Sequence, residues 1–259
     1  MTVPLVICAI FKNEALYFKE WIEFHCIVGF EHLFLYNNQS SDNYLEVLQP
    51  YIDKQIVTLV EWDFPSPCQL SCYQHFIDKN NQKKVWCAFI DLDEALFSPT
   101  NMPLPDMLNF IDQPGAIGIN WKCFGSSGLE EYDSRPVIER FTYHPLEFYG
   151  DKHIKSIIRL DQPVIVGGDP HFFQTTSSTV NENGVFITSA TSDPSSNIFR
   201  INHYLTKSKN EYIEKRNRGR ADIPKEDDKF DWSVFNALNC GVEDLAIQKF
   251  LPELKRRLA

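Results

Sequence analysis

The sequence predicts an α/β protein, with a mostly parallel central sheet flanked by helices and a mixed sheet in its second half. Through the first hundred residues, short runs of β-branched and aromatic residues alternate with segments whose apolar residues recur every three or four positions. This alternation is typical of parallel strands joined by right-handed helical crossovers. After Pro99 the alternation loosens and strand-like runs follow one another, which predicts a mixed sheet there.

The expected elements can be placed in order along the chain. In the first half we expect strands at 4–11, 31–38, 54–62 and 85–93, and helices at 14–29, 43–53 and 68–81. Gly29 closes the first helix, and Ser41 and Asp42 are candidate caps for the second. In the second half we expect a short helix at 103–112, a strand entering a Gly/Ser loop at 115–128, strands at 153–160 and 163–173 paired antiparallel, strands at 184–189 and 197–205, a charged helix at 208–220 and a polar, mobile-looking segment at 221–232.

Composition limits the class of protein. The chain has 259 residues, 43% of them hydrophobic, which is enough for one well-buried core, and no repeat or low-complexity linker divides it. A formal net charge of −10 argues against non-specific nucleic-acid binding, because phosphate neutralisation needs a basic face. The seven cysteines are scattered without a zinc-binding pattern, so we expect reduced, structural thiols in a reducing compartment.

The two ends of the chain bear on location. The opening "MTVPLVICAIFKNE" has no basic n-region and reads as a strand, and no window of about 18 apolar residues occurs. Leu251, Leu254 and Leu258 share one face of a final helix beside three basic residues, which predicts an ordinary helix or, alternatively, one lying on a membrane surface. We therefore expect a cytoplasmic protein, with the inner face of the membrane as the alternative location.

Three acids end the fourth expected strand, in "VWCAFIDLDE". In an extended segment Asp91 and Asp93 would point to the same side, and two adjacent carboxylates repel unless a cation lies between them. The carboxyl ends of such strands are where α/β sheets bind ligands, and carboxylates suit Mg²⁺ or Mn²⁺. The alternative is a solvated strand end or a helix cap.

Polar residues also follow the first two strands. Lys12, Asn13 and Glu14 open the first helix, whose free N–H groups could meet an anion or a polar ring; the alternative is a plain turn capped by Asn13. Asn37, Asn38 and Asp42 could bind a nucleobase and ribose, or could form an Asx-rich turn. Neither a dinucleotide-binding nor a P-loop glycine motif is present.

Together these segments resemble a known family. The stretch "AIFKNEALYFKEWIEFHCIVGFEHLFLYNNQSSDN", the "FIDLDE" strand end, "NWKCFGSSG", "KSIIR" and "INHYLTKSKNEYIEKRNRGRAD" are similar to family 92 glycosyltransferases of the GT-A superfamily. The resemblance covers most of residues 3–222, and the ordered combination is more specific than any one motif. It implies a single GT-A-like domain over 1–259, with a nucleotide-sugar-binding half (1–100), an acceptor and metal half (101–222) and a C-terminal helical segment (223–259).

The resemblance also implies the chemistry. It implies an inverting transfer of galactose or a similar hexose from a nucleotide sugar, a UDP-sugar above all, to a glycan or lipid-linked acceptor. Asp91 would contact the ribose or the metal, and Asp93 would be the firmer ligand of Mn²⁺ or Mg²⁺. His203 matches the position of a C-terminal histidine ligand; without the resemblance we would interpret it as a strand histidine with a satisfied ring.

Several residues are candidates for the remaining roles. Lys207 begins a local basic patch that is either a flexible lid over the diphosphate or a solvated helix face, and Lys155 is a second candidate for phosphate contact.

An inverting transfer needs a base. Asp169 is the first candidate, with Glu130, Glu131 and His171 as rivals. Trp121 and His171 are candidates for acceptor binding, although Trp121 could equally be a core residue.

Two other function classes stay open. A nucleotidyl or phosphoryl transferase would also use paired aspartates with Mg²⁺, but would be expected to carry a glycine-rich phosphate loop. A non-catalytic nucleotide-sugar-binding module would not need Asp93, His203 and a basic patch together. Product analysis separates the two kinds of transferase, and turnover separates both from a binding module.

Overall fold

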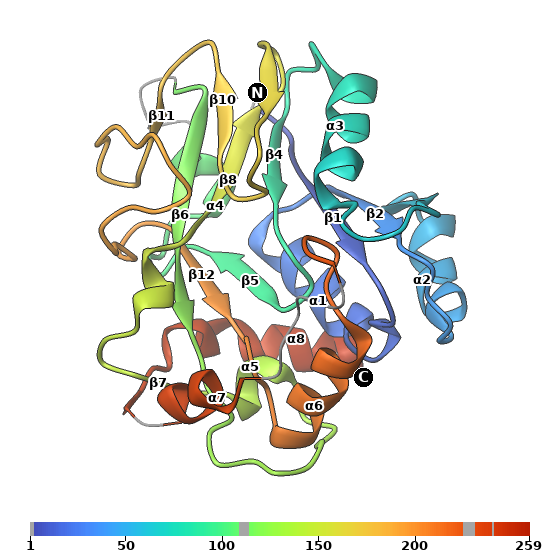
Figure 1. The fold of residues 1–259 in the computed structure, drawn as a ribbon, viewed down its shortest axis with the longest axis vertical. Coiled ribbons are helices and arrows are strands. Elements are labelled where there is room, and N and C mark those ends of the chain that lie inside the picture. Colours follow the sequence, from blue (N-terminus) through green and yellow to red (C-terminus); the bar gives the residue numbers. More distant parts are fainter. Residues whose placement is uncertain (1–2, 109–113, 225–230, 240) are drawn as a thin grey trace.

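The computed structural model describes residues 3–108, 114–224, 231–239 and 241–259. The strands of its main sheet are β1 (Leu5–Phe11), β2 (His32–Asn37), β3 (Val57–Glu61), β4 (Trp86–Phe89), β5 (Glu94–Phe97), β6 (Ala116–Cys123), β8 (Ile154–Arg159), β11 (Thr179–Val180) and β12 (Arg200–His203). Their order is β3-β2-β1-β4-β8-β6-β12-β5, with β11 beside β6 (Figure 1). Two small sheets pair β7 (Tyr143–His144) with β13 (Val242–Glu243), and β9 (Val164–Val166) with β10 (Phe173–Thr175).

The helices connect and cover these strands. They are α1 (Ala15–Val28), α2 (Tyr44–Asp53), α3 (Gln69–Asn80), α4 (Leu104–Leu108), α5 (Val137–Arg140), α6 (Lys209–Arg218), α7 (Trp232–Leu238) and α8 (Leu251–Leu258), with 3-10 helices η1 (Tyr149–Lys152) and η3 (Ala246–Phe250). Part of the expected helix at 103–112 and of the polar segment at 221–232 lies outside the described residues.

Strand directions confirm the predicted α/β class. β3, β2, β1 and β4 are mutually parallel. β8 then runs antiparallel between β4 and β6, β12 is parallel to β6, and β5 is antiparallel to β12. The first half is therefore a parallel sheet and the second half continues it as a mixed one.

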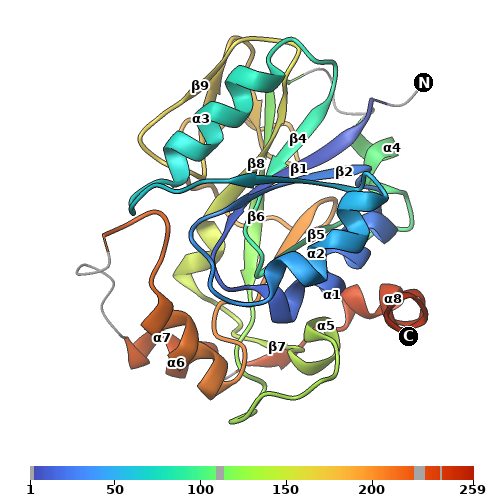
Figure 2. The same cartoon turned by 90° about the vertical axis from the view of Figure 1, so that its right-hand side faces the viewer.

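Two layers of apolar side chains hold the sheet between helices. Alternate residues of β1 belong to different core clusters, because successive side chains in a strand point to opposite faces. One cluster joins β1 to α1, α2 and α8, and the other joins it to α3, so these helices lie on opposite faces of the sheet (Figure 2). β1 is buried along its whole length, which explains its continuous apolar sequence.

The final helix packs on the core. Leu254 of α8 is fully buried, and Leu251 and Leu258 pack beside it against the α1 cluster. Its apolar face is thus covered by protein, which favours the ordinary-helix interpretation over the membrane-surface one. No helix among the described residues has the length and apolar character needed to span a membrane.

Some local predictions were wrong. The strand at 163–173 pairs within itself, as β9 with β10, because β8 is already paired on both edges by β4 and β6. Residues 184–189 contribute only an isolated bridge, Val180 to Phe186. Ser41 and Asp42 do not cap α2; Asp42 instead accepts a hydrogen bond from the backbone of Ala15 at 2.8 Å, at the start of α1. The six described cysteines are free, as expected.

Candidate active site

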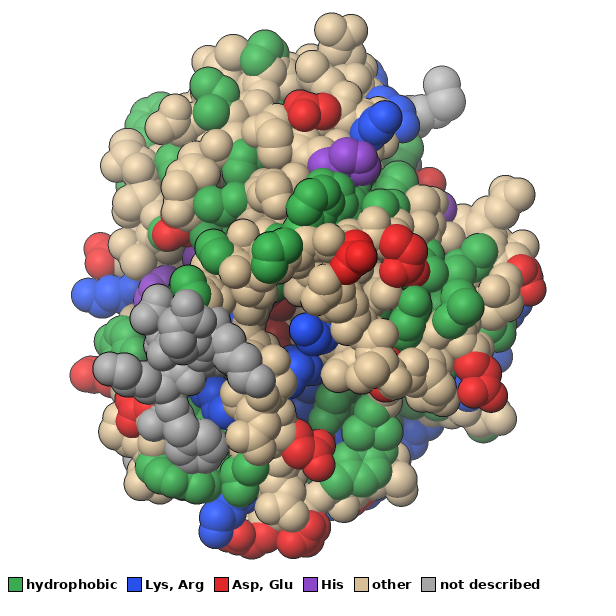
Figure 3. Space-filling model, turned by 45° about the vertical axis from the view of Figure 1, so that its right-hand side comes forward, with side chains coloured by type: hydrophobic (Ala, Val, Ile, Leu, Met, Phe, Trp, Pro, Cys, Tyr) green, Lys and Arg blue, Asp and Glu red, His purple; other side chains and the backbone are tan. Residues whose placement is uncertain are grey.

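A cleft of about 600 Å³ opens at the carboxyl ends of β1 and β4. Figure 3 shows the hollow on this face, with Lys and Arg side chains gathered along it. Six of the residues that line it are basic: Lys12, Lys155, Lys215, Arg216, Arg218 and Arg220. Four are acidic: Glu14, Asp91, Asp93 and Asp222. In a chain of net charge −10, this local excess of positive charge marks a place suited to an anionic ligand.

The acids of "DLDE" lie in a turn rather than on a straight strand. β4 ends at Phe89, and the Glu94 N–H donates to the Asp91 carbonyl at 3.1 Å. The chain then reverses into β5, which was not predicted. The expectation that Asp91 and Asp93 share one side of an extended segment was therefore wrong, although both line the cleft.

Asp93 meets His203 across two strands. β5 pairs with β12 so that Glu94 is opposite His203, which brings His203 Nε2 to 3.2 Å from Asp93 Oδ2. Lys215 Nζ donates to the same carboxylate oxygen. Burial alone would raise the pKa of Asp93, but Lys215 and His203 outweigh it and hold the pKa well below its usual value. Burial lowers the pKa of His203 against the opposing effect of Asp93.

Asp91 has different partners. Its Oδ2 accepts from Lys155 Nζ at 2.7 Å, and its Oδ1 accepts from Gln69 Nε2 at 3.0 Å. Glu94 lies behind it, fully buried, with Oε2 accepting from the Asp91 N–H at 3.0 Å. Burial would lower the pKa of Lys155, but Asp91 and Glu94 raise it, whereas burial raises the pKa of Glu94 well above its usual value. Neither Glu94 nor Gln69 was among the predicted site residues.

The basic helix α6 is held firmly at its start. Ser208 and Glu211 form a reciprocal capping box. Glu211 also pairs with the buried Arg140 at 2.8 Å and accepts from the Tyr17 hydroxyl at 2.8 Å. The buried ion pair and the Tyr17 contact anchor the first turn of α6 to α5 and α1.

At its far end α6 reaches the start of α1. Arg218 pairs with Glu14 at 2.6 Å and donates to the Asn13 carbonyl at 3.0 Å. Asn13 accepts from the Ser41 N–H at 2.7 Å, and like Asp42 it is not among the residues lining the cleft. Their contacts connect the loops after β1 and β2, so their proposed donor contacts have no support from the geometry.

Of the remaining candidates for donor binding, three line the cleft and one does not. Lys12, Glu14 and Asn38 line the cleft, although Asn38 Nδ2 is already used by the carbonyls of Trp62 and Phe64. Lys207, in contrast, lies outside the residues lining the cleft.

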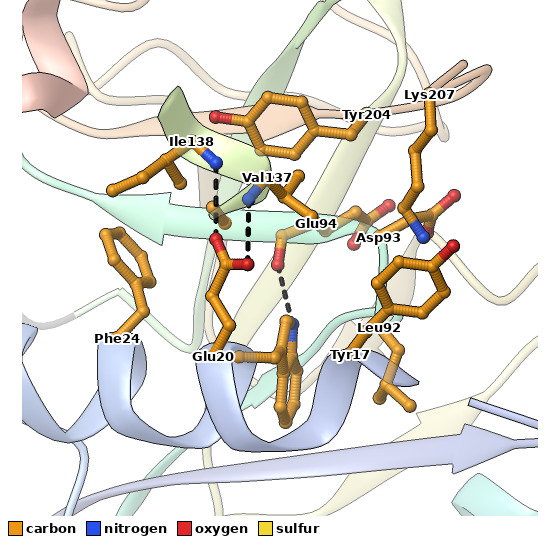
Figure 4. Close-up of a pocket in the computed structure, with 12 residues that line it drawn as sticks. Tyr17, Glu20, Phe24, Leu92, Asp93, Glu94, Val137, Ile138, Tyr204 and Lys207 are labelled. Atoms are coloured by element: carbon orange, nitrogen blue, oxygen red, sulfur yellow. Dashed lines mark hydrogen bonds between the residues drawn. The ribbon is translucent and has the colours of Figure 1, made fainter. Parts of the chain in front are cut away.

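Lys207 lines a small, mostly apolar pocket that shares Leu92 and Asp93 with the cleft (Figure 4). Its ammonium lies 3.4 Å from the centre of the Tyr17 ring, and burial lowers its pKa. In the same cavity Glu20 accepts from the N–H groups of Val137 and Ile138, at 2.7 and 3.2 Å. Lys207 is thus an internal residue here rather than the first residue of a lid.

The acceptor candidates lie at the other end of the cleft. Trp121 and His171 line it, but the Trp121 ring packs among three histidines, with ring centroids 4.2 Å from His203, 5.0 Å from His171 and 5.2 Å from His153. This favours Trp121 as a packed residue with only part of its ring toward the cleft. The segment "EFYGDKH" adds Tyr149 and His153 to the lining, and neither residue was predicted by name, although the aromatic residues of this segment were a signal for them.

Of the four candidate bases, His171 lines the cleft, whereas Asp169, Glu130 and Glu131 do not. Asp169 Oδ1 accepts from the His171 N–H at 2.7 Å, so its carboxylate lies beside a lining residue. Glu130 is 68% exposed and pairs with Lys209, and Glu131 accepts from Asn210 at 2.5 Å. The structure thus separates both glutamates from the carboxylates of the cleft.

The residues fit a divalent cation in part. Asp93 Oδ2 and His203 Nε2 are 3.2 Å apart, close to the separation of about 3 Å between neighbouring ligands of an octahedral ion. Within the described part of the chain, no group of three His, Cys, Asp or Glu side chains is arranged around a metal position. Mg²⁺ often takes only one or two protein ligands when phosphate completes its shell, so Asp93 and His203 suit that arrangement, whereas Asp91 is engaged by Lys155.

A comparison with family models decides the family. The model of glycosyltransferase family 92 matches residues 3–230. The chain belongs to glycosyltransferase family 92. A family 92 protein of rice (Oryza sativa subsp. japonica) is 29% identical over 174 residues, and one of Ricinus communis is 27% identical over 160 residues. These matches cover 65% and 60% of this chain but only 29% and 28% of those proteins, so the chain spans less than a third of their length.

Solved structures share only a distant likeness. Residues 1–349 of TarS from S. aureus align with a TM-score of 0.41 and 15% identity, covering 61% of this chain and 47% of that one. The mannosyltransferase of Pyrobaculum calidifontis, solved with GDP-Man and Mn²⁺, aligns with a TM-score of 0.35 and 12% identity, covering 47% and 36%. Likeness at this level says nothing about the ligand of this family 92 chain.

Proposed function

We propose that this family 92 chain transfers a hexose, galactose or a similar sugar, from a UDP-sugar to a glycan or lipid-linked acceptor, with inversion at the sugar carbon. The charge of the cleft is the observation that carries the proposal. Six basic side chains converge at the carboxyl ends of the parallel strands of a strongly acidic chain. A diphosphate leaving group is the anion that such a transferase must bind and stabilise.

Asp93 and His203 would hold a Mn²⁺ or Mg²⁺ ion on that diphosphate. When bound, the ion would act as a Lewis acid on the leaving group. Lys155 and Lys12 would add fixed positive charge beside the phosphates. Asp91, whose carboxylate is oriented by Lys155 and Gln69, would face the ribose.

The acceptor hydroxyl must lose its proton to a base. Our candidate is Asp169, with His171 as the alternative, because both belong to the turn that borders the Trp121 end of the cleft. His171 Nδ1 lies 2.9 Å from the Ile154 carbonyl, which would leave Nε2 as the acceptor. Burial lowers the pKa of His171 to about 3, which removes the usual advantage of an imidazole over a carboxylate as the base.

A donor screen tests the proposal. The protein is incubated with UDP-, GDP- and CMP-sugars, with and without Mn²⁺, while free nucleotide is followed and thermal shift reports binding in the same plate. We expect one UDP-sugar to raise the melting temperature and to release UDP in the presence of Mn²⁺. Should no nucleotide sugar bind, the donor assignment fails. NMR of the product then tests inversion directly.

The free cysteines suggest where the protein works. All six described thiols are unpaired, which supports our proposal of a cytoplasmic location. Accumulation of the protein in an oxidising compartment, with disulfides found by mass spectrometry, would contradict it.

A further inference from the structure

Lys215 occupies the place where a cation would be expected. Its Nζ donates to Asp93 Oδ2, the oxygen that also faces His203, and to the Leu205 carbonyl at 3.0 Å. The lysine comes from α6, whose first turn is anchored by the buried pair of Glu211 and Arg140. The ammonium is therefore brought to Asp93 by a fixed helix rather than by chance contact of a mobile side chain.

We propose that Lys215 is a built-in counter-ion of Asp93, which a divalent metal ion must displace, and which then pairs with the diphosphate of the donor. The inference rests on the proposed function and adds a competition to it. Two cations on one carboxylate oxygen repel strongly at such short range, so metal and Lys215 cannot both hold Asp93. Once displaced, the lysine is already a lining residue of the cleft.

The second lysine of the site shows why Lys215 is the exchangeable one. Lys155 has a side chain only 1% exposed and lies between Asp91, at 2.7 Å, and Glu94, at 3.8 Å. Moving the Lys155 ammonium away from these carboxylates would leave its positive charge buried and without a partner. Among the described residues Lys215 pairs with one carboxylate, and its side chain is 23% exposed, so its ammonium can move into the open cleft once a metal ion takes its place on Asp93.

Such an exchange links the two ligands of the cleft. A diphosphate that binds the released ammonium favours the state in which the metal holds Asp93, and by linkage the metal favours diphosphate binding to the same degree. Metal alone should therefore bind weakly to the wild-type protein, because it must break the ion pair without compensation.

The test measures Mn²⁺ alone, with no nucleotide present. Free Mn²⁺ is titrated by electron paramagnetic resonance against wild type, Lys215→Met and the control Lys209→Met, an exposed lysine of the same helix that is not in the cleft lining. We expect Lys215→Met to bind Mn²⁺ roughly tenfold more tightly than wild type, as removal of a competing charge predicts, and Lys209→Met to match wild type. Equal or weaker binding by Lys215→Met, or no binding by either, overturns the proposal.

A second variant identifies the site and guards against misfolding. The double variant Asp93→Asn/Lys215→Met leaves no unpaired buried charge and should lose the gain in Mn²⁺ affinity while keeping a wild-type circular dichroism spectrum. If it retains the gain, the ion binds elsewhere and the proposal fails. The donor screen and the Mn²⁺ titration distinguish failure of the proposed function from failure of this inference. A protein that binds no UDP-sugar could still bind Mn²⁺ more tightly as the Lys215→Met variant than as wild type.

Discussion

Replacing Glu211 by glutamine should destabilise the protein strongly, because this carboxylate anchors the basic helix. Its side chain is 3% exposed and that of Arg140 is 1% exposed. Arg140 donates to it at 2.8 and 3.2 Å, and the Tyr17 hydroxyl donates at 2.8 Å. Glu211→Gln keeps the shape but leaves a buried guanidinium without its opposite charge.

The magnitude follows from the burial of both partners. Removing one partner of a buried ion pair costs about 3–5 kcal/mol. We expect about 3 kcal/mol for Glu211→Gln, since the amide oxygen still accepts one of these hydrogen bonds. The double variant Arg140→Met/Glu211→Leu should lose less than Glu211→Gln, because an apolar pair leaves no charge buried.

Urea unfolding at pH 7, followed by circular dichroism, measures these differences. Asp133→Asn is the matched control, because it removes a carboxylate that also pairs with an arginine but lies on the surface. It should leave the unfolding free energy nearly unchanged. A loss below about 1 kcal/mol for Glu211→Gln would refute the view that this pair anchors α6.

Four further outcomes are expected. Asp93→Asn should abolish Mn²⁺-dependent binding of the donor, measured by calorimetry with and without the ion, while the fold persists. Asp169→Asn should lower kcat by roughly a hundredfold with little change in the KM for the donor, measured by steady-state kinetics. Burial on folding lowers the pKa of His25 from 6.5 to about 3. Between these pH values the unfolded state binds more protons than the folded state, so the free energy of unfolding falls as pH drops, by up to about 1.4 kcal/mol per pH unit. His25→Gln should make this pH dependence less steep, as measured by urea unfolding. Gly125→Ala should destabilise by about 1–3 kcal/mol in thermal unfolding, because the new Cβ would lie 2.0 Å from the Leu238 carbonyl oxygen.

Each of these outcomes has a control. Glu130→Gln, on an exposed side chain, should leave kcat at the wild-type value, and a larger loss there than in Asp169→Asn would move the base to Glu130. Gly167→Ala should be neutral, because nothing lies within 4 Å of its added Cβ. An acid sensitivity that is unchanged in His25→Gln would show that other groups dominate the pH dependence. Donor binding by Asp93→Asn at wild-type affinity would remove Asp93 from the metal site.

The parallel half of the fold could be predicted because its periodicity is local. Every strand and helix expected before Phe89 is present, because the apolar composition of runs such as 4–11 is by itself that of a buried strand. β5 could not be predicted in the same way. β5 has only four residues, Glu94–Phe97, and their sequence has no strong β-strand propensity. They form a strand because β12 pairs with them.

The candidate site was predictable only where a motif named the residues. Asp93 came from the acids at a strand end and His203 from the resemblance, and the structure brings the two together. The contact between Asp93 and Lys215 spans 122 residues and leaves no trace in local patterning. Glu130 lies outside the cleft lining for a related reason: nearness to a Gly/Ser loop in sequence does not determine where a side chain points.

The pairing of β5 with β12 also sets when the site can exist during synthesis. Asp93 leaves the ribosome 110 residues before His203, and at about 5–20 residues per second that gap lasts roughly 5–20 s. During this interval the nascent chain carries the parallel sheet with an unpaired β5 and an aspartate that has neither its histidine nor its lysine. Synthesis of β12 and α6, rather than folding of the first half, is therefore the event that gives Asp93 its histidine and lysine partners.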